Sequence, residues 1–158
     1  MLIERREQQI YASHSQFYVE DGERPSDTGA ADFWTENANE DRLATVPGTI
    51  GIATGTYGNV RVVIEVHTTE PSMDLAAWDH ITEASLNIES GVLRVIGCLD
   101  RIAEDFNVIP NTYRVRCCHA NLAESDEYGE AGQDWYVVQV WPAPESPRRI
   151  TKRWSIAA

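Results

Sequence analysis

The stretch Asn-Val-Arg-Val-Val-Ile-Glu-Val-His-Thr, residues 59–68, decides the fold class of this chain. Its even-numbered positions from 60 to 66 hold Val, Val, Ile and Val, whereas Arg61, Glu65 and His67 lie among the odd-numbered ones. Successive side chains of a β-strand point to opposite faces, so this period of two predicts a strand. One face of that strand is apolar and the other largely polar, which is typical of an antiparallel sheet with one face against a core.

Strand-like alternation recurs on both sides of this stretch, and Ser90-Gly91 predicts a hairpin turn between two of the segments. Residues 36–44 and 100–105 are long enough only for short helices. Because no helix separates consecutive strands, we expect an all-β antiparallel sandwich, for which a jelly-roll is one topology to consider. The further expected strands are residues 9–19, 49–54, 81–88, 92–98, 112–119 and 135–141, and we expect residues 121–134 to be a hairpin connection between the last two.

The chain of 158 residues has the length of one domain. We expect residues 1–144 to form that domain and residues 145–158 to form a basic C-terminal tail. No apolar run approaches the length of about 20 residues that spans a bilayer, and no apolar segment follows the charged N-terminus. The sequence therefore predicts a cytoplasmic protein without a membrane contact, in which Cys98, Cys117 and Cys118 are free thiols.

The net charge of −12 is concentrated in two segments. Residues 20–42 contain eight acidic and two basic side chains, and residues 121–134 contain five acidic and no basic ones. Such a field repels nucleic-acid phosphate and attracts basic proteins, so we expect a basic protein partner and no direct nucleic-acid binding. A charge kept for solubility is the simpler interpretation. The tail, with four basic residues against one acid, could itself bind the acidic segments and occupy the partner surface.

Motifs that identify a reaction are missing from the sequence. There is no glycine-rich phosphate loop, no G-x-S-x-G, no H-E-x-x-H and no EF-hand pattern, and the four histidines lack a metal-binding spacing. We therefore expect a protein that is not an enzyme and needs no cofactor or metal. Arg114 and Arg116 share one face of a strand, next to Arg94 if that neighbour pairs with it; they form either a solvated face that balances nearby acids or an anion site.

A ligand-binding sandwich is the alternative function. The carboxylates of residues 121–134 could bind calcium, which takes six to eight oxygen ligands. Trp135 and Trp141, with Tyr136 between them, could form a platform for a carbohydrate. A structural subunit whose tail docks on an acidic neighbour is a third possibility.

The order of several short motifs resembles that of a known family. Ser-His-Ser-Gln-Phe-Tyr-Val at 13–19 is followed by an acidic loop with Phe-Trp-Thr at 33–35. Gly-Val-Leu at 91–93 and Pro-Asn-Thr-Tyr-Arg-Val-Arg at 110–116 come next, before an acidic stretch and an aromatic strand. Over residues 12–141 this order is similar to the competence protein J family, small acidic bacterial proteins that inhibit a DNA-entry nuclease. In general character the chain also resembles immunity proteins that neutralise toxins.

The resemblance implies an inhibitor that presents carboxylates to a site built for phosphate. It supplies no individual binding residue, so the candidates come from the acidic loops themselves. Charged residues at the rim of an interface mainly raise the association rate, and aromatic anchors slow dissociation. The expected partner-binding residues are Asp27, Asp32, Phe33, Trp34, Glu36, Glu124, Asp126, Glu127, Tyr128, Glu130 and Asp134.

Overall fold

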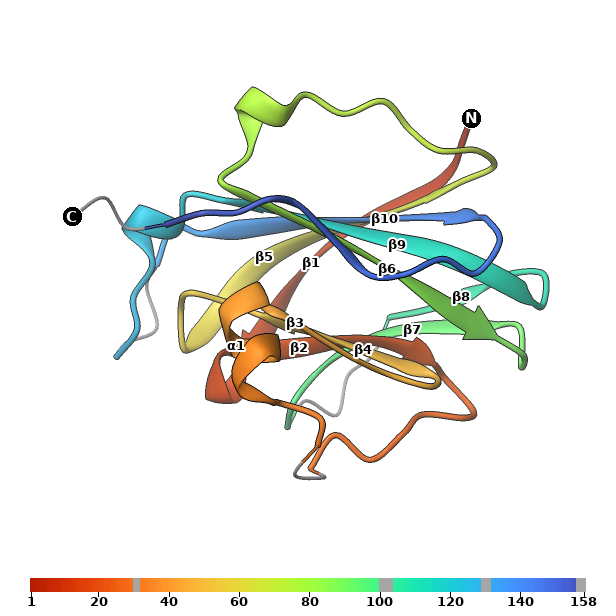
Figure 1. Cartoon of the computed structure of the whole chain (residues 1–158), viewed down its shortest axis with the longest axis horizontal. Helices are drawn as coiled ribbons and strands as arrows, with labels where there is room; N and C mark the ends of the chain where they lie inside the picture. The colour runs from red at the N-terminus through yellow and green to blue at the C-terminus, as the bar shows by residue number, and fades with distance from the viewer. Residues whose placement is uncertain (30–31, 100–103, 129–131, 156–158) are drawn as a thin grey trace.

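Two β-sheets face each other in the computed structural model, which describes residues 1–29, 32–99, 104–128 and 132–155 (Figure 1). The all-β sandwich expected from the sequence is confirmed. One sheet has the order β1 (Leu2–Ala12), β5 (Gly58–His67), β10 (Trp135–Pro142), β9 (Asn111–Ala120), β6 (His80–Ile88) and β11 (Arg149–Lys152). The other has the order β3 (Leu43–Val46), β4 (Thr49–Ala53), β2 (Gln16–Asp21), β7 (Val92–Gly97) and β8 (Glu104–Asn107).

The core lies between the sheets, and the alternation within β5 determines which side chains enter it. Val60, Val62 and Ile64 are buried there together with the side chains that face them from the other sheet, among them Phe17 and Val95. Strands β9 and β10 pair as the antiparallel hairpin that residues 112–119 and 135–141 predicted. One pair departs from the antiparallel expectation, because β10 runs parallel to β5 on its other side.

The predicted strand at residues 9–19 is in fact two strands in different sheets. The 3₁₀ turn η1 (Ser13–Ser15) separates them, and His14 and Ser15 have φ values of 59° and 57°. Inward-facing residues are even-numbered before this turn, as at Ile10, and odd-numbered after it, as at Phe17 and Val19. That change of parity is what a bend between two sheets produces, because side chains alternate strictly along one strand.

The predicted hairpin at Ser90-Gly91 is also wrong, because β6 and β7 belong to different sheets. The turn residue Gly91 has φ of 78°, which favours glycine, and the chain crosses there from one sheet to the other. The buried carboxylate of Asp21 fixes this crossing by accepting hydrogen bonds from the backbone of Glu89 and Ser90 at 2.9 and 3.2 Å.

The helix expected at residues 36–44 is confirmed only in part. Helix α1 (Glu36–Asp41) begins at the Thr35 cap and ends at Arg42, whose φ is 58°. The chain then continues as β3 instead of a longer helix. Of the helix expected at residues 100–105, residues 100–103 lie outside the described residues, and 104–105 belong to strand β8.

The outer face of the six-stranded sheet is covered, where the sequence predicted a face in water. Val63, Ile81, Cys118 and Val137 form a second apolar layer there. The segment between β5 and β6, which contains η2 (Leu75–Ala77), passes over this layer (Figure 1). Cys117 packs in the main core instead, so the adjacent thiols of Cys117 and Cys118 are on opposite faces. Among the residues that the structure describes, no helix is long and apolar enough to cross a membrane.

Candidate partner-binding surface

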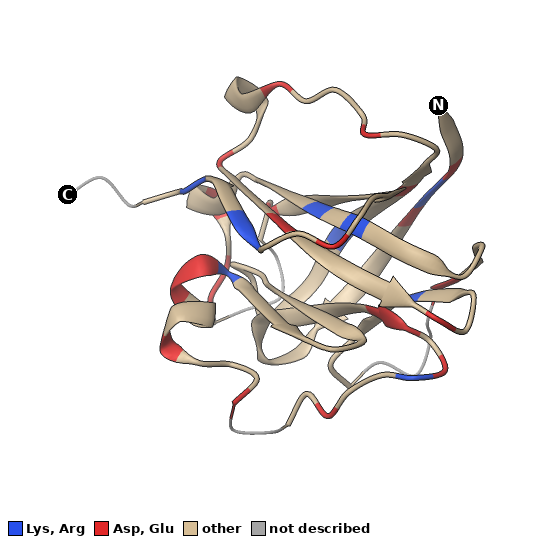
Figure 2. Cartoon of the chain, turned by 45° about the vertical axis from the view of Figure 1, so that its right-hand side comes forward, with Lys and Arg blue, Asp and Glu red and all other residues tan. Residues whose placement is uncertain are grey.

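The part of the first acidic segment around helix α1 lies at the same end of the sandwich as the second acidic segment, whereas Glu20 and Asp21 lie at the opposite end of β2. The adjacent residues Asp79 and His80 contact both segments at the start of β6. His80 Nε2 lies 2.8 Å from the backbone oxygen of Asp41, at the end of α1. The backbone N–H of Leu122, which begins η3 (Leu122–Glu124), donates to Asp79 Oδ2 at 2.9 Å. Figure 2 shows acidic residues of both segments at this end, which we call the acidic end.

The buried side chain of Asp134 holds the second acidic segment in place, although the sequence predicted Asp134 as a residue that contacts the partner. Its side chain is 2% exposed. Its carboxylate accepts hydrogen bonds from the backbone N–H groups of Gly55 and Thr56 at 3.2 and 3.1 Å, from the Thr56 hydroxyl and from the Tyr136 hydroxyl. These donors account for both carboxylate oxygens, so Asp134 positions the segment instead of offering charge to a partner.

Other predicted residues of this segment do face solvent. Asp126 is half-buried, and its backbone oxygen accepts from Tyr57 N–H at 3.1 Å. Glu124 and Glu127 are exposed, and the Tyr128 side chain is 93% exposed. Glu130 lies outside the described residues. The described part of the segment therefore presents the exposed carboxylates of Glu124 and Glu127 and the ring of Tyr128 on a backbone that is tied to the turn between β4 and β5.

Phe33 anchors the first acidic segment in the same way that Asp134 anchors the second. It is 2% exposed and packs against Tyr18 and Trp34, with ring centroids 6.0 and 5.5 Å apart. The half-buried Trp34 donates through Nε1 to Gln16 Oε1 at 2.5 Å. The predicted residues on this segment that remain exposed are Asp27, Asp32 and Glu36.

Because Gly51 has no side chain, it leaves the space that the rings of Phe33 and Trp34 fill. A Cβ atom at this position would lie 2.8 Å from Phe33 Cζ and 2.9 Å from Trp34 Cζ2. We expect Gly51→Ala to lower the free energy of unfolding by about 1–3 kcal/mol, because both rings must leave their places. Urea unfolding measures this. Phe33→Leu in the same chain should restore part of the loss, whereas a loss below about 0.5 kcal/mol would contradict the packing.

Two exposed tyrosines that the sequence did not indicate lie next to this end. Tyr11 and Tyr57 are 38% and 37% exposed, and their rings meet edge to face with centroids 6.4 Å apart. The His14 ring lies 5.9 Å from Tyr57. Tyr57 belongs to a glycine-rich turn, residues 55–58, and an aromatic residue in such a turn was the available signal, because turns lie on the surface.

The C-terminal segment folds back on the first acidic segment, as the charge pattern allowed. Arg148 and Arg153 both bind the carboxylate of Asp41, with N–O distances of 2.9 and 2.6 Å. Arg153 also donates to the backbone oxygen of Glu40 at 3.0 Å. Within the described part of the chain, these contacts leave the exposed carboxylates of Glu36, Glu124 and Glu127 to solvent. The acidic end is therefore only partly occupied by the tail.

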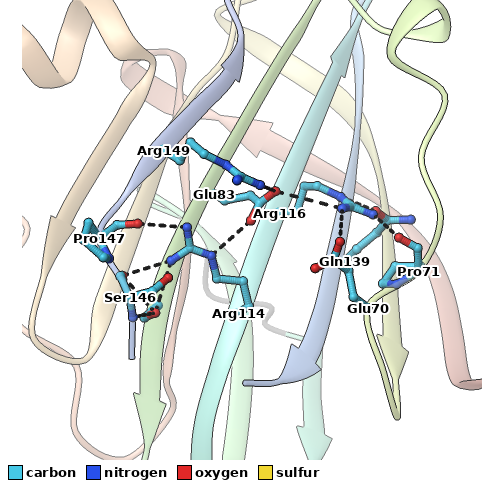
Figure 3. Close-up of polar contacts among 10 residues, drawn as sticks. Glu70, Pro71, Glu83, Arg114, Arg116, Gln139, Ser146, Pro147 and Arg149 are labelled. Atoms are coloured by element: carbon cyan, nitrogen blue, oxygen red, sulfur yellow. Dashed lines mark hydrogen bonds and ion pairs between the residues drawn. The ribbon is translucent and has the colours of Figure 1, made fainter. Parts of the chain in front are cut away.

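Arg114 and Arg116 form neither a solvated face nor a pair with Arg94, which lies in the other sheet and binds Asp105. Both are buried, at 5% and 1% exposure, on the outer face of the six-stranded sheet (Figure 3). Arg114 Nε donates to Glu83 Oε1 at 3.1 Å, and Arg116 donates to Gln139 and to the Pro71 backbone oxygen. Arg149 of β11 binds the other oxygen of Glu83 at 3.0 Å.

The aromatic residues proposed for a carbohydrate platform are packed within the fold. Trp141 is buried beneath Arg116, whose guanidinium carbon lies 5.0 Å from the ring centroid. Trp135 packs on Trp78 with centroids 5.2 Å apart, so the two tryptophans do not form an open platform. In the described ranges no group of three or more His, Cys, Asp or Glu side chains is arranged to hold a metal ion.

Fold and surface together define a two-sheet β-sandwich with a carboxylate-rich end. Comparison with solved structures finds the same fold in ComJ of Bacillus subtilis, described as an inhibitor of the DNA-degrading activity of NucA. That match has a TM-score of 0.71 and 15% identity, and it covers 90% of this chain and 99% of ComJ. A second match, crocagin biosynthetic gene J, has a TM-score of 0.55 and 15% identity over 89% of this chain and 98% of its own.

These matches confirm, for the fold, the resemblance to the competence protein J family that the sequence indicated. No family model matches the sequence, and no curated protein matches it. At 15% identity the likeness to ComJ establishes a shared architecture.

Proposed function

We propose that this protein is a non-enzymatic inhibitor that covers the active site of a basic nuclease or toxin with its acidic end. The observation that carries the proposal is that the α1 part of the first acidic segment and the second acidic segment lie at one end of the sandwich. The contacts of Asp79 and His80 hold the segments there, and Glu36, Glu124 and Glu127 remain exposed. The shared fold with a nuclease inhibitor supports the same class of function.

The surface combines the two features that such an interface needs. Carboxylates on a rigid support compete for the cationic groups with which a nuclease holds phosphate, and their field accelerates encounter with a basic protein. Aromatic side chains that are already ordered provide the contacts that slow dissociation, because little conformational entropy is lost when they are buried. Tyr57 and Tyr11 are held edge to face beside Asp126, which makes them the best candidates for that role.

Charge reversal at the exposed carboxylates tests the electrostatic part of the proposal. The triple variant Glu36→Lys, Glu124→Lys, Glu127→Lys should slow association with the partner by about tenfold or more at low salt, and by less at high salt. The control is Glu145→Lys, an exposed acid outside both acidic segments. The partner to use is a basic nuclease or toxin captured by pull-down with this protein from its source organism, with rates from surface plasmon resonance and inhibition from a DNA-degradation or toxicity assay.

Truncation of the exposed Tyr57 side chain tests the proposed aromatic contacts with the partner. Tyr57→Ala should speed dissociation with little change in association, and weaken binding by about 2 kcal/mol, which is roughly thirtyfold. Equal association rates for the triple variant and its control, or an affinity independent of ionic strength, would contradict the proposed surface.

A further inference from the structure

The C-terminal segment, residues 148–154, joins helix α1 to the edge of the six-stranded sheet. Strand β11 pairs with β6, with register contacts from Arg149 to Glu83 and from Ile150 to Thr82. On either side of this strand, an arginine binds the same carboxylate of Asp41. Arg148 also donates to the backbone oxygen of Leu43 at 2.7 Å. The segment is therefore held at α1 and at β3, along the edge of β6, and against the core through Ile150 and Trp154. Lys152 also donates to the backbone oxygen of Leu75 at 2.9 Å.

His80 contacts both the end of helix α1 and the C-terminal segment. Its side chain is 0% exposed. Nε2 lies 2.8 Å from the Asp41 backbone oxygen, and Nδ1 lies 3.0 Å from the backbone nitrogen of Trp154. A carbonyl oxygen can only accept and a backbone N–H can only donate, so Nε2 carries the proton and Nδ1 is the acceptor. The geometry therefore requires the neutral imidazole in one defined tautomer.

Protonation of this ring is incompatible with the contact to the tail. The added proton is bound to Nδ1, where it points at the N–H of Trp154, so that two donors face each other. The hydrogen bond is lost, and the Trp154 N–H is left without an acceptor in a half-buried position. The bond from Nε2 to Asp41 is retained, so the change acts on the tail and not on α1.

Charged and titratable groups on the surrounding elements influence the pKa of His80. Burial is the largest influence and lowers the pKa of His80, and the positive charges of Arg42 and Arg153 lower it further, whereas Asp41 acts in the opposite direction. The His119 ring of β9 lies 4.9 Å away, and the Tyr136 ring of β10 lies 5.1 Å beyond it. Burial holds the pKa of His119 well below its ordinary value, so His80 takes up the first proton.

We propose that residues 148–154 form a pH-sensitive latch on the acidic end, which neutral His80 holds closed and protonated His80 releases. Release withdraws Arg148 and Arg153 from Asp41 and returns its carboxylate to the acidic surface. As a structural device the latch stands on these contacts alone; as a means of regulating inhibition it rests on the proposed function.

The direction of the pH effect on the latch follows from the protonation state of His80 that the closed latch requires. Because the Trp154 N–H can donate only to neutral His80, the pKa of His80 is lower in the closed than in the open state. Closure is therefore fully favoured above the pKa that His80 has in the open state, and is lost as the pH falls through the lower pKa of the closed state.

Amide hydrogen exchange on the whole protein tests the latch without any partner. Exchange rates of residues 149–154, corrected for intrinsic rates, should rise between about pH 7 and about pH 5. The rise should be about tenfold for each unit by which the pKa of His80 differs between the closed and the open state. Protection in β9 and β10 serves as the internal control and should stay constant. Equal protection of the tail at both pH values would overturn the proposal.

His80→Gln separates the proposed cause from general acid effects. A glutamine amide can donate to one neighbour and accept from the other but does not titrate in this range, so the variant should keep its tail protected at both pH values. Persistent pH dependence in this variant would overturn the proposal. In the unaltered protein, a histidine NMR titration should place the His80 midpoint at the pH where tail protection is lost, and midpoints that differ would also overturn it. Failure of these tests leaves the inhibitor proposal untouched, because no partner is present.

Discussion

Replacing Glu83 by leucine should lower the free energy of unfolding by about 3–5 kcal/mol, which is a large share of the stability of a domain of this size. Glu83 is 3% exposed and binds Arg114 on one oxygen and Arg149 on the other. Arg116 lies 4.0 Å from it and is buried as well. Leucine nearly preserves the volume but leaves buried guanidinium groups without their counter-charge.

The measurement is chemical denaturation, with the loss expected in the midpoint and not in the slope. Glu70→Gln is the matched control, because Glu70 lies 3.9 Å from the same Arg116 with its side chain 63% exposed. We expect that change to stay within about 0.5 kcal/mol of the unaltered protein. A loss below about 1 kcal/mol for Glu83→Leu would show that the arginines find other partners or water.

The contribution of Glu83 should also depend on pH in a defined sense. Burial raises the pKa of its carboxyl, but hydrogen bonds from Arg114 and Arg149 outweigh burial and leave the pKa below its ordinary value. A depressed folded-state pKa means that this stabilisation is complete above the ordinary glutamate value, about 4.3, and is lost as the pH falls through the lowered one. The difference in stability between the unaltered protein and Glu83→Leu should therefore shrink in acid.

The second large effect is expected at Asp134, where alanine should cost about 3 kcal/mol or more. The substitution removes the acceptor for two backbone N–H groups, at Gly55 and Thr56, and for two hydroxyls. Thr56 and Tyr136 are 0% exposed, so water does not readily replace the lost acceptor. The loss also loosens the segment that carries Glu124 and Glu127.

Thermal unfolding and limited proteolysis of residues 121–134 measure the two consequences separately. Asp126→Ala is the control, because its carboxylate accepts only a 3.3 Å bond from Tyr128 N–H among the contacts within the described segments. We expect it to change stability by less than about 1 kcal/mol. If Asp134→Ala leaves both the midpoint and the protease resistance of the segment unchanged, Asp134 is not the residue that positions it.

The sequence predicted what depends on local periodicity. The alternation of residues 59–68 correctly assigned the inward face of β5, and the two runs at 112–119 and 135–141 correctly predicted a hairpin. The charge pattern left open whether the tail returns to the acidic segments, and in the structure it binds the first one, where Asp41 accepts two arginines.

What the sequence could not predict depends on partners far away in the chain. Asp134 is acidic and lies in an acidic segment, but its role is set by donors at residues 55 and 56. Phe33 is an aromatic residue in a loop, and its burial depends on Gly51 below it. The sequence of the C-terminal segment indicates only a basic tail, because its residues form strand β11 only by pairing with the edge of β6. The assignment of Glu36, Glu124 and Glu127 to a partner surface stays a prediction.

The parallel pair of β5 and β10 has a consequence for how this protein is made on the ribosome. Strand β10 lies between β5 and β9, so the six-stranded sheet is divided in two until residues 135–142 have left the exit tunnel. Contacts that join β5 to a strand more than 70 residues later form slowly, because a long loop must close first. Until then, the edges of β5 and β9 that β10 joins have no strand partner, and the six-stranded sheet is completed only by this late strand.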